Sequence, residues 1–395
     1  PARRSRGRVS VSRRRLPAAV RWPSPSAVLR WLLLRCGLGA AALPTVDPVA
    51  VGHVRWVEAP GGRQLEVRTL SAEPPVFLVP GLLDEEEADE LVGMAQKRRD
   101  WKGSLTTQGD EHLRRGLRRG GRAGRDALLG FDHDQDGRLS AEELGRLAED
   151  AYNMPNYDHQ SLVRYVLGEA AGAAEDVSVA DAARRRIGKF FDRVVREEPH
   201  RLSRFSHQVW LRHRGALLEA LLDRARAVTQ LPAAIVSKSE PLQVVRYRRR
   251  GHYSCHHDSS SDDIDGGDAR LGTLGVFLNN VTRGGETVFP ASFRTDMDSW
   301  GTGEWSYFES RCQRTEACTQ LGGLRITPRK GDGVFWYNIR PGLLQEFAEG
   351  GWPAGFGVRA LVWSSLHCAA KVLEGEKWFA NLWLRLRARP QKKEL

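Results

Sequence analysis

The sequence feature that most restricts the fold is a twelve-residue run of acidic and small residues between Asp132 and Glu143. Carboxylates stand at its first, third and fifth positions, a glycine at the sixth permits a sharp bend, and a glutamate closes it at the twelfth. Ca²⁺ takes oxygen ligands in this order from a loop that joins two helices. The run therefore predicts a helix–loop–helix calcium site, with a solvated acidic loop as the alternative. The expected ligands are Asp132, Asp134, Asp136, the Arg138 carbonyl, Ser140 through a water, and Glu143.

A second loop of the same kind is expected downstream, because such helix–loop–helix units, called EF-hands, usually pair. The frame 170–181 keeps an apolar residue, Val177, at its eighth position. Ala170, Gly172 and Ala174 stand where carboxylates are needed, and their side chains cannot bind a hard cation. We therefore predict one intact and one degenerate hand, and the alternative that no second hand exists stays open.

The basic charge of the chain is concentrated at its N-terminus. The formal net charge is +11, but the first 35 residues contain ten arginines and no acidic residue, so the remainder carries about +1. A basic face that binds nucleic acid is therefore not expected.

An apolar segment, 27–46, follows this basic tail and predicts a transmembrane signal anchor. Arg30 and Arg35 interrupt it, and a charge near the centre of a spanning helix costs about 2.5 to 3.5 kcal/mol. The core of a signal peptide is the alternative. If the segment inserts, the positive-inside rule keeps the arginines in the cytosol and places the rest of the chain in the lumen.

The residue pattern changes near Leu242 from one typical of helices to one typical of strands. Helical periodicity runs from 126 to about 230, whereas short β-branched and aromatic runs with glycine-rich turns follow, which predicts a barrel or a sandwich. The strands that we expect are 242–247, 273–278, 333–337, 358–366 and 377–381.

Potential metal ligands crowd together within this strand-rich part. On a strand, residues two apart share a face, so His256 and Asp258 lie together while His257 faces away. A His-X-Asp pair with a distant histidine is the facial triad of non-haem Fe(II) oxygenases. His367, 111 residues after His256, is the candidate third ligand. A zinc site and surface imidazoles are the alternatives. Lys377 could neutralise the distal carboxylate of a dicarboxylic co-substrate, or it could be a solvated edge lysine.

The ordered motifs of residues 65–385 resemble those of the prolyl 4-hydroxylases. The resemblance rests on the runs 239–247 and 251–253, the run 277–290, the run 335–338, and His367 followed by Lys377 and Trp378. It implies an α+β chain whose double-stranded β-helix, a jelly roll, carries an inserted helical EF-hand domain.

The resemblance also implies a site and a reaction. Fe(II) would be bound by His256, Asp258 and His367, and 2-oxoglutarate by Lys377, with Tyr247 and Thr273 lining its pocket. O2 would be consumed to hydroxylate a prolyl C4 with release of succinate, and L-ascorbate would support turnover. The implied partner is a proline-containing peptide, collagen-like or of the hypoxia-inducible-factor type, and a homodimer is left open. The implied location is the endoplasmic reticulum membrane, with the catalytic domain in the lumen.

Four departures from the family pattern leave a second interpretation open. Phe277 stands where a tyrosine is frequent, and His257 occupies a usually apolar position, where it could compete for metal. The run 248–250 is Arg-Arg-Arg, which would favour acidic peptides, and Cys-Ala-Ala follows His367. The alternative function is therefore a calcium-binding pseudoenzyme or interaction protein.

The cysteines and one sequon complete the expectations. Cys312 and Cys318 could form a disulfide in an oxidising lumen. Cys255 and Cys368 adjoin the metal-ligand motifs, so they are candidates either for oxidation or for buried packing. Asn280 opens an Asn-Val-Thr glycosylation sequon.

The expected organisation follows from these motifs. Hydrophobic residues make up 41% of the chain, unlike a disordered polymer. The predicted parts are a basic tail (1–26), the anchor (27–46), an N-terminal part of the catalytic region with a Gly- and Arg-rich linker (47–125), the EF-hand domain (126–200), the dioxygenase domain (201–385) and a tail (386–395).

Overall fold

The computed structural model describes residues 43–103, 111–293, 302–314, 318, 322–349 and 353–385. The basic tail, most of the expected anchor and the C-terminal tail lie outside these residues. Among the helices that are described, none combines the length and the apolar character needed to span a bilayer.

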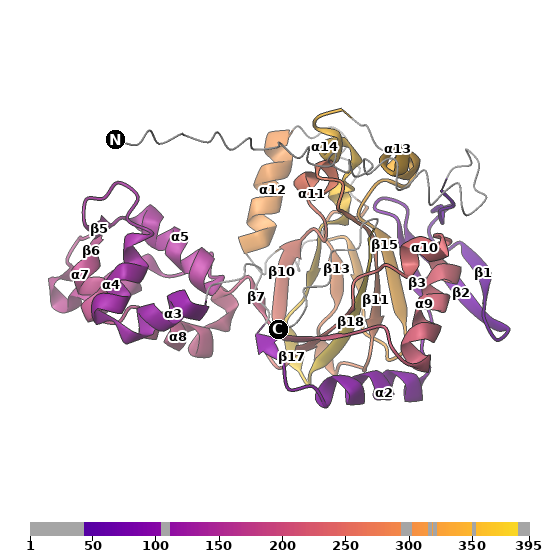
Figure 1. Ribbon diagram of the computed structural model, residues 1–395, viewed down its shortest axis with the longest axis horizontal. Coiled ribbons are helices and arrows are strands. Elements are labelled where there is room, and N and C mark those ends of the chain that lie inside the picture. The colour runs from indigo at the N-terminus through magenta and orange to yellow at the C-terminus, as the bar shows by residue number, and fades with distance from the viewer. Residues whose placement is uncertain are drawn as a thin grey trace, which may run out of the picture.

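A nine-stranded antiparallel sheet forms the largest part of the fold (Figure 1). Helices α2 (Glu85–Gln96), α9 (Ala216–Thr229) and α10 (Ala233–Val236) share an apolar core with one of its faces. The strand order is β1 (Val54–Ala59), β2 (Arg63–Ser71), β3 (Val76–Val79), β15 (Gly333–Tyr337), β11 (Arg270–Phe277), β18 (Lys377–Arg385), β9 (Leu242–Tyr247), β8 (His207–Leu211) and β4 (Lys102–Gly103).

A five-stranded sheet packs against the other face. Phe289 and Ile326 of this minor sheet share a buried cluster with Phe277, Trp336 and Phe379 of the major sheet. Two facing antiparallel sheets with helices outside confirm the expected mixed, jelly-roll type of architecture. The order in the minor sheet is β14 (Leu324–Ile326), β13 (Thr287–Phe289), β16 (His367–Ala369), β10 (His252–His256) and β7 (Arg204–Phe205), and β12 (Arg283–Gly284) pairs with β17 (Val372–Glu374) beside it.

The rim of the barrel carries short helical segments. Helix α12 (Thr302–Arg314) contacts β10, and α11 (Ser261–Asp265) contacts α14 (Phe356–Ala360). The remaining segments are α13 (Leu344–Glu349) and 3₁₀ turns at Pro341–Leu343 and Trp363–Ser365.

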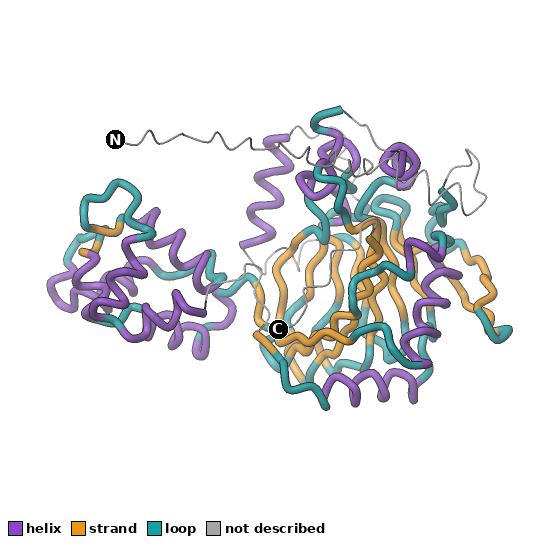
Figure 2. Tube along the Cα trace, in the orientation of Figure 1, coloured by secondary structure: helices purple, strands orange, loops and turns teal. Residues whose placement is uncertain are grey.

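A helical module with its own core lies beside the barrel and is joined to it through β7 (Figures 1 and 2). Arg250 of the barrel donates to the Glu197 carbonyl of the module over 2.9 Å. The elements of the module are α3 (Glu111–Arg119), α4 (Gly121–Leu129), β5 (Arg138–Leu139), α5 (Ala141–Tyr152), α6 (His159–Leu167), β6 (Val177–Ser178), α7 (Val179–Arg184) and α8 (Gly188–Glu197), with 3₁₀ turns at Gly168–Ala171 and Pro199–Arg201.

The two loops of this module meet at their eighth positions. Leu139, eighth in the acidic loop, pairs with Val177, eighth in the degenerate frame, through the β5–β6 ladder. Both side chains are buried. The geometry therefore matches the register expected of a hand and a degenerate partner, while calcium binding itself stays a prediction.

The expected linker at 103–125 is wrong where the structure describes it, because residues 111–119 and 121–125 are helical. Leu117 is buried in the module's core. A Cβ at Gly116 would lie 3.0 Å from the Ala123 carbonyl, so the glycines there permit close packing of α3 on α4. Glycine content indicated flexibility in the sequence, whereas it serves helix packing in the fold.

Two other secondary-structure expectations are also wrong. The helical region does not run unbroken to 230, because His207–Leu211 forms a strand that pairs with β9. The strand expected at 358–366 is replaced by α14 and a 3₁₀ turn, and the only ladder contact there is a bridge between Ile339 and Leu361. The apolar residues of this segment pack into the core, which explains their pattern in the sequence, but no neighbouring strand pairs with them along their length. The strands expected at 242–247 and 333–337 are confirmed.

Candidate active site

Three potential metal ligands meet between the two sheets. His256 ends β10 and His367 begins β16, and these two residues are paired across the antiparallel ladder. The His256 Nε2 lies 3.8 Å from Asp258 Oδ1, and the His367 Nε2 lies 3.6 Å from Asp258 Oδ2. Ligand atoms of all three residues fall within 4.8 Å of one another. Chain segments more than a hundred residues apart are thus brought to one point, as a facial triad requires.

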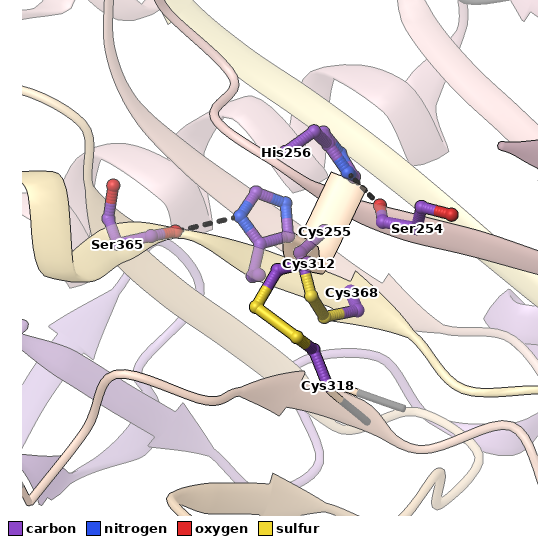
Figure 3. The surroundings of a disulfide bond; sticks show 8 residues. Ser254, Cys255, His256, Cys312, Cys318, Ser365 and Cys368 are labelled. Carbon is purple, nitrogen blue, oxygen red and sulfur yellow. Dashed lines mark hydrogen bonds between the residues drawn. A yellow bond between two sulfur atoms is a disulfide. The ribbon is translucent and has the colours of Figure 1, made fainter. Parts of the chain in front are cut away.

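Both imidazoles are oriented by their own backbone. The Nδ1 of His256 lies 2.9 Å from the Ser254 carbonyl, and the Nδ1 of His367 lies 2.9 Å from the Ser365 carbonyl (Figure 3). Each ring therefore donates from Nδ1 and leaves the Nε2 lone pair directed at the centre of the triad. Burial, reinforced for His256 by its neighbour His367, lowers the pKa of both rings, so they are neutral and able to bind metal near pH 7.

Asp258 is held as a carboxylate by its neighbours. The Thr273 hydroxyl donates to its Oδ2 over 2.7 Å, and Asn338 Nδ2 in turn donates to Thr273 over 3.1 Å. Burial opposes ionisation, but the histidines of the triad, Arg270 and the Thr273 hydrogen bond outweigh it and bring the pKa of Asp258 to about 2. Thr273, expected in the co-substrate pocket, is fully buried and contacts Asp258 instead of lining the cavity.

A cavity of about 220 Å³ is lined by all three members of the triad and by Lys377. Lys377 is only 1% exposed, and burial lowers its pKa to about 7. Its Nζ donates to Thr287 Oγ1 over 3.3 Å and lies 5.7, 5.4 and 5.0 Å from the ring centroids of Tyr247, Phe277 and Phe379. Burial also raises the pKa of Tyr247, which therefore stays a neutral phenol. An ammonium group enclosed by aromatic rings and one hydroxyl is a site for an anion of matching size.

The cavity wall also contains residues that the sequence analysis did not identify. The Arg204 guanidinium lies 4.3 Å from the centroid of the Tyr253 ring, which stacks on His256 at 3.6 Å. On the opposite side, Arg270 lies 3.5 Å over the Trp383 ring. Side chains alternate between the two faces of a strand, so the positions of β8 and β18 could have indicated which residues face inward. For β8 this required recognising the strand at 207–211 first. Inward-facing residues of these two strands are Gln208, Trp210, Lys377, Phe379, Asn381 and Trp383.

None of the departures from the family pattern is a member of the triad, although His257, Cys368 and Ala369 line the same cavity. His257 Nδ1 contacts Glu309 Oε1 at 3.1 Å and its Nε2 contacts the Trp363 carbonyl at 2.8 Å, so the expectation that it could compete for metal is wrong. Phe277 is fully buried beside Lys377. The arginines at 248–250 are exposed and absent from the cavity wall, so a preference for acidic peptides stays a prediction.

All four cysteines beside the barrel form disulfides. Cys312 is joined to Cys318, as the sequence allowed, and Cys255 is joined to Cys368 (Figure 3). Of the two roles expected for Cys255 and Cys368, buried packing is confirmed, and the disulfide between them was not predicted. They lie on adjacent strands, which the sequence could not place together.

The acidic loop gathers its first, third and twelfth residues. Oxygens of Asp132, Asp134 and Glu143 lie within 4.8 Å of one another. Asp132 Oδ2 accepts from the Gly137 amide over 3.1 Å, whereas its Oδ1 is buried and has no hydrogen-bond partner among the described residues. A buried carboxylate oxygen without a donor fits a cation at this point. The other expected ligands lie outside this trio. Asp136 accepts from the Arg138 amide, and the Arg138 guanidinium donates to Asp176. The Ser140 hydroxyl donates to Glu143.

Comparisons with known proteins agree with this site. Residues 242–385 match the model of the 2OG-Fe(II) oxygenase superfamily. The chain is 30% identical over 377 residues to the transmembrane prolyl 4-hydroxylase of Mus musculus, covering 87% of this chain and 70% of that protein. The Homo sapiens protein of the same name is 29% identical over 390 residues, with 88% and 71% covered. Among solved structures, a viral collagen prolyl hydroxylase from Paramecium Bursaria Chlorella virus-1 superposes with a TM-score of 0.31 at 23% identity, covering 50% of this chain and 87% of that one.

Proposed function

We infer the activity of the chain from its membership of the prolyl 4-hydroxylase family of Fe(II)- and 2-oxoglutarate-dependent dioxygenases. It is a prolyl 4-hydroxylase, which couples the oxidative decarboxylation of 2-oxoglutarate to the hydroxylation of peptidyl proline. The main support for this function is that His256, Asp258 and His367 lie together in the wall of a cavity that Lys377 also lines.

In the mechanism that we propose, the triad of His256, Asp258 and His367 would hold Fe(II). Neutral His256 and His367 and ionised Asp258 supply two nitrogens and one carboxylate, the ligand set that suits a non-haem iron centre. The bound metal supplies the chemistry by which O2 and 2-oxoglutarate yield succinate, CO2 and a hydroxylated substrate carbon. Thr273 keeps one Asp258 oxygen directed by its hydrogen bond, so the carboxylate does not rotate.

We assign the binding of 2-oxoglutarate to the inner end of the cavity. The Lys377 ammonium would pair with the distal carboxylate, and Thr287 would hold the ammonium in place. The rings of Tyr247, Phe277 and Phe379 exclude water from this end, which strengthens the ion pair. Phe277 cannot donate a hydrogen bond, but it contributes to this aromatic enclosure, so its presence does not favour the pseudoenzyme.

We assign the binding of the peptide to the outer end of the cavity. The Arg204–Tyr253 and Arg270–Trp383 pairs present flat aromatic and guanidinium faces there, and such faces bind extended, proline-containing segments. Collagen-like and hypoxia-inducible-factor-type peptides both belong in the substrate test.

The test is succinate release by the full chain with Fe(II), ascorbate as reductant and a proline peptide panel. We expect the His367→Ala variant to lose turnover and a His200→Ala variant, changed at an exposed position of the module, to retain it. Turnover that survives His367→Ala would overturn the assignment, and absence of turnover in the unchanged chain would favour the calcium-binding pseudoenzyme.

We further propose that the helical module binds Ca²⁺ through the acidic loop, on the basis of the Asp132 oxygen described above. Calorimetric titration with Ca²⁺ tests this proposal, and the absence of a binding isotherm would contradict it.

We also propose that the segment 27–46 anchors the protein in the endoplasmic reticulum membrane, since the two animal relatives are named as transmembrane proteins. A lumenal catalytic domain would also permit glycosylation of Asn280, whose side chain is exposed. Endoglycosidase sensitivity and protease protection of microsomes test both points, and cross-linking tests the homodimer.

A further inference from the structure

One disulfide joins the two strands that carry the histidines of the triad. Cys255 immediately precedes His256 on β10, and Cys368 immediately follows His367 on β16. Because side chains alternate along a strand, the sulfur atoms lie on the face opposite to the imidazoles. The disulfide, drawn in Figure 3, therefore links the two ligand-bearing strands next to the histidines.

Backbone pairing between these strands is short and interrupted. Strand β16 has only three residues, and the β10–β16 register shifts between the Tyr253–Ala369 pair and the His256–His367 pair. Each imidazole is oriented by a carbonyl of its own segment, Ser254 or Ser365, and not by the opposite strand. The ring-to-ring separation, 4.4 Å between centroids, thus depends on how firmly the two strands are held against each other.

The disulfide is shielded from solvent. Cys255 and Cys368 are 2% and 1% exposed, and they share a buried cluster with Phe308 and Cys312 of α12 and with Cys318. Burial of the sulfur atoms slows reduction of this bond, so in the folded protein it constrains the strands unless excess reductant is added.

We propose that the Cys255–Cys368 disulfide is a positioning element for the metal centre, which sets the spacing of His256 and His367 and so raises metal affinity. The inference rests on the proposed function, because it needs both histidines to bind metal. The Cys312–Cys318 bond is a natural comparison, since it packs in the same cluster but spans only six residues and joins no ligand-bearing strand.

The test compares two double variants of the full chain, Cys255→Val with Cys368→Val and Cys312→Val with Cys318→Val. Valine approximates the volume of a half-cystine, so packing is kept while the cross-link is lost. Co(II) is the probe, with its affinity measured by equilibrium dialysis and its ligand geometry by visible absorption. Circular dichroism establishes that each variant is folded at the temperature used.

We expect Co(II) affinity to fall about 10- to 100-fold in the first variant, the range seen when groups that orient metal ligands are removed. The Co(II) spectrum should change with it, and the second variant should keep both the affinity and the spectrum. A purely structural disulfide would lower the melting temperature without changing the affinity of the folded protein. A folded first variant with unchanged Co(II) affinity and spectrum overturns the proposal.

A second measurement covers the case in which the first variant does not fold. The unchanged chain is treated with graded amounts of a phosphine reductant, which is oxidised to its oxide as each disulfide takes up two electrons and two protons. Thiols are then alkylated and mapped by mass spectrometry. Loss of bound Co(II) should follow the opening of Cys255–Cys368, and loss that follows Cys312–Cys318 alone overturns the proposal.

Failure of the proposed function is distinguishable from failure of this inference. If the unchanged chain binds Co(II) no better than the His367→Ala variant, the metal site itself is misassigned and both proposals fall. If His367→Ala abolishes binding while the valine pair at 255 and 368 leaves it unchanged, only the positioning role is lost.

Discussion

The two candidate metal sites of this protein are built in opposite ways. The acidic loop would supply all the ligands of a calcium site from twelve consecutive residues, and most of these residues are exposed. The triad instead combines His256 and Asp258, at and just beyond the end of β10, with His367 at the start of β16. His256 and His367 are 111 residues apart in the sequence and are enclosed between two sheets. The acidic loop is formed by the backbone of one short segment, whereas the triad forms only when the strands of the barrel are packed together.

This difference determines which residues outside the ligands matter. In the loop, backbone amides of the loop itself bind the carboxylates, as the Gly137 amide binds Asp132. In the triad, residues distant in sequence hold the ligands in place. The Thr273 hydroxyl on β11 donates a hydrogen bond to Asp258, and a disulfide links β10 to β16. A buried site assembled from distant strands therefore offers more positions at which a substitution weakens it.

The largest effect should come from removing the charge at the centre of the triad. We expect Asp258→Asn to lower turnover by more than about 100-fold, because loss of a ligand should exceed the 10- to 100-fold cost of losing a group that only orients one. Calcium binding by the module should be unchanged in the same variant, which separates the two sites. Succinate release and calcium calorimetry measure the two effects.

An Asp262→Asn variant is the matched control, since Asp262 is an exposed carboxylate on α11 close in sequence. Equal losses in the two variants would contradict a specific role for Asp258.

The next effect concerns the inner end of the cavity and its dependence on pH. A lysine with a pKa of about 7 keeps its proton below pH 7 and loses it as the pH rises. Because only the charged form pairs with a carboxylate, the KM for 2-oxoglutarate should rise towards about tenfold per pH unit above pH 7. The profile is measured by succinate release between pH 6 and about 9.

The Lys377→Arg variant should flatten this profile, because a guanidinium stays charged throughout that range. A variant profile as steep as that of the unchanged chain would show that another group titrates.

A smaller effect is expected where the triad depends on a distant strand. Thr273→Val removes the hydrogen bond to Asp258 and leaves Asn338 without its partner, so Co(II) affinity should fall about tenfold. Stability should fall by about 1 to 3 kcal/mol, the cost of an unpaired buried polar group. Equilibrium dialysis and chemical unfolding measure the two quantities.

Thr229→Val is a suitable control, because Thr229 is equally buried but donates to a carbonyl within α9. If both threonine variants bind Co(II) as the unchanged chain does, the Thr273 hydrogen bond does not position the carboxylate.

The smallest effect on turnover should come from the calcium loop. Glu143→Gln removes the charge that closes the loop, so calcium affinity should fall at least about tenfold in calorimetry. No residue of the loop lines the dioxygenase cavity, so succinate release without calcium should be the same in the variant and the unchanged chain. A variant with lower turnover in the absence of calcium would show that the module acts on the cavity through contacts such as Arg250 with Glu197.

The sequence predicted most of the candidate ligands but few of the residues that position and surround them. Residues two apart on a strand placed His256 with Asp258, position along the chain made His367 and Lys377 candidates, and the resemblance assigned the roles of all four. The role of Thr273 could not be predicted, because its partner Asp258 lies beyond the end of β10 and faces β11 only in the folded sheet. Arg204 was missed because the β7–β8 region was interpreted as helical, which hid its alternation.

The sequence by itself determined the features that depend on neighbouring residues: the acidic loop, the eighth-position residue of its degenerate partner, the strand at 242–247 and the His-X-Asp pair. The tertiary structure alone decided the pairing of Cys255 with Cys368, the burial that lowers the pKa of Lys377, and the convergence of the triad. The reason is physical. A local pattern is set by the backbone geometry of a few residues, whereas a distance between strands and the exclusion of water are set by packing across the whole barrel.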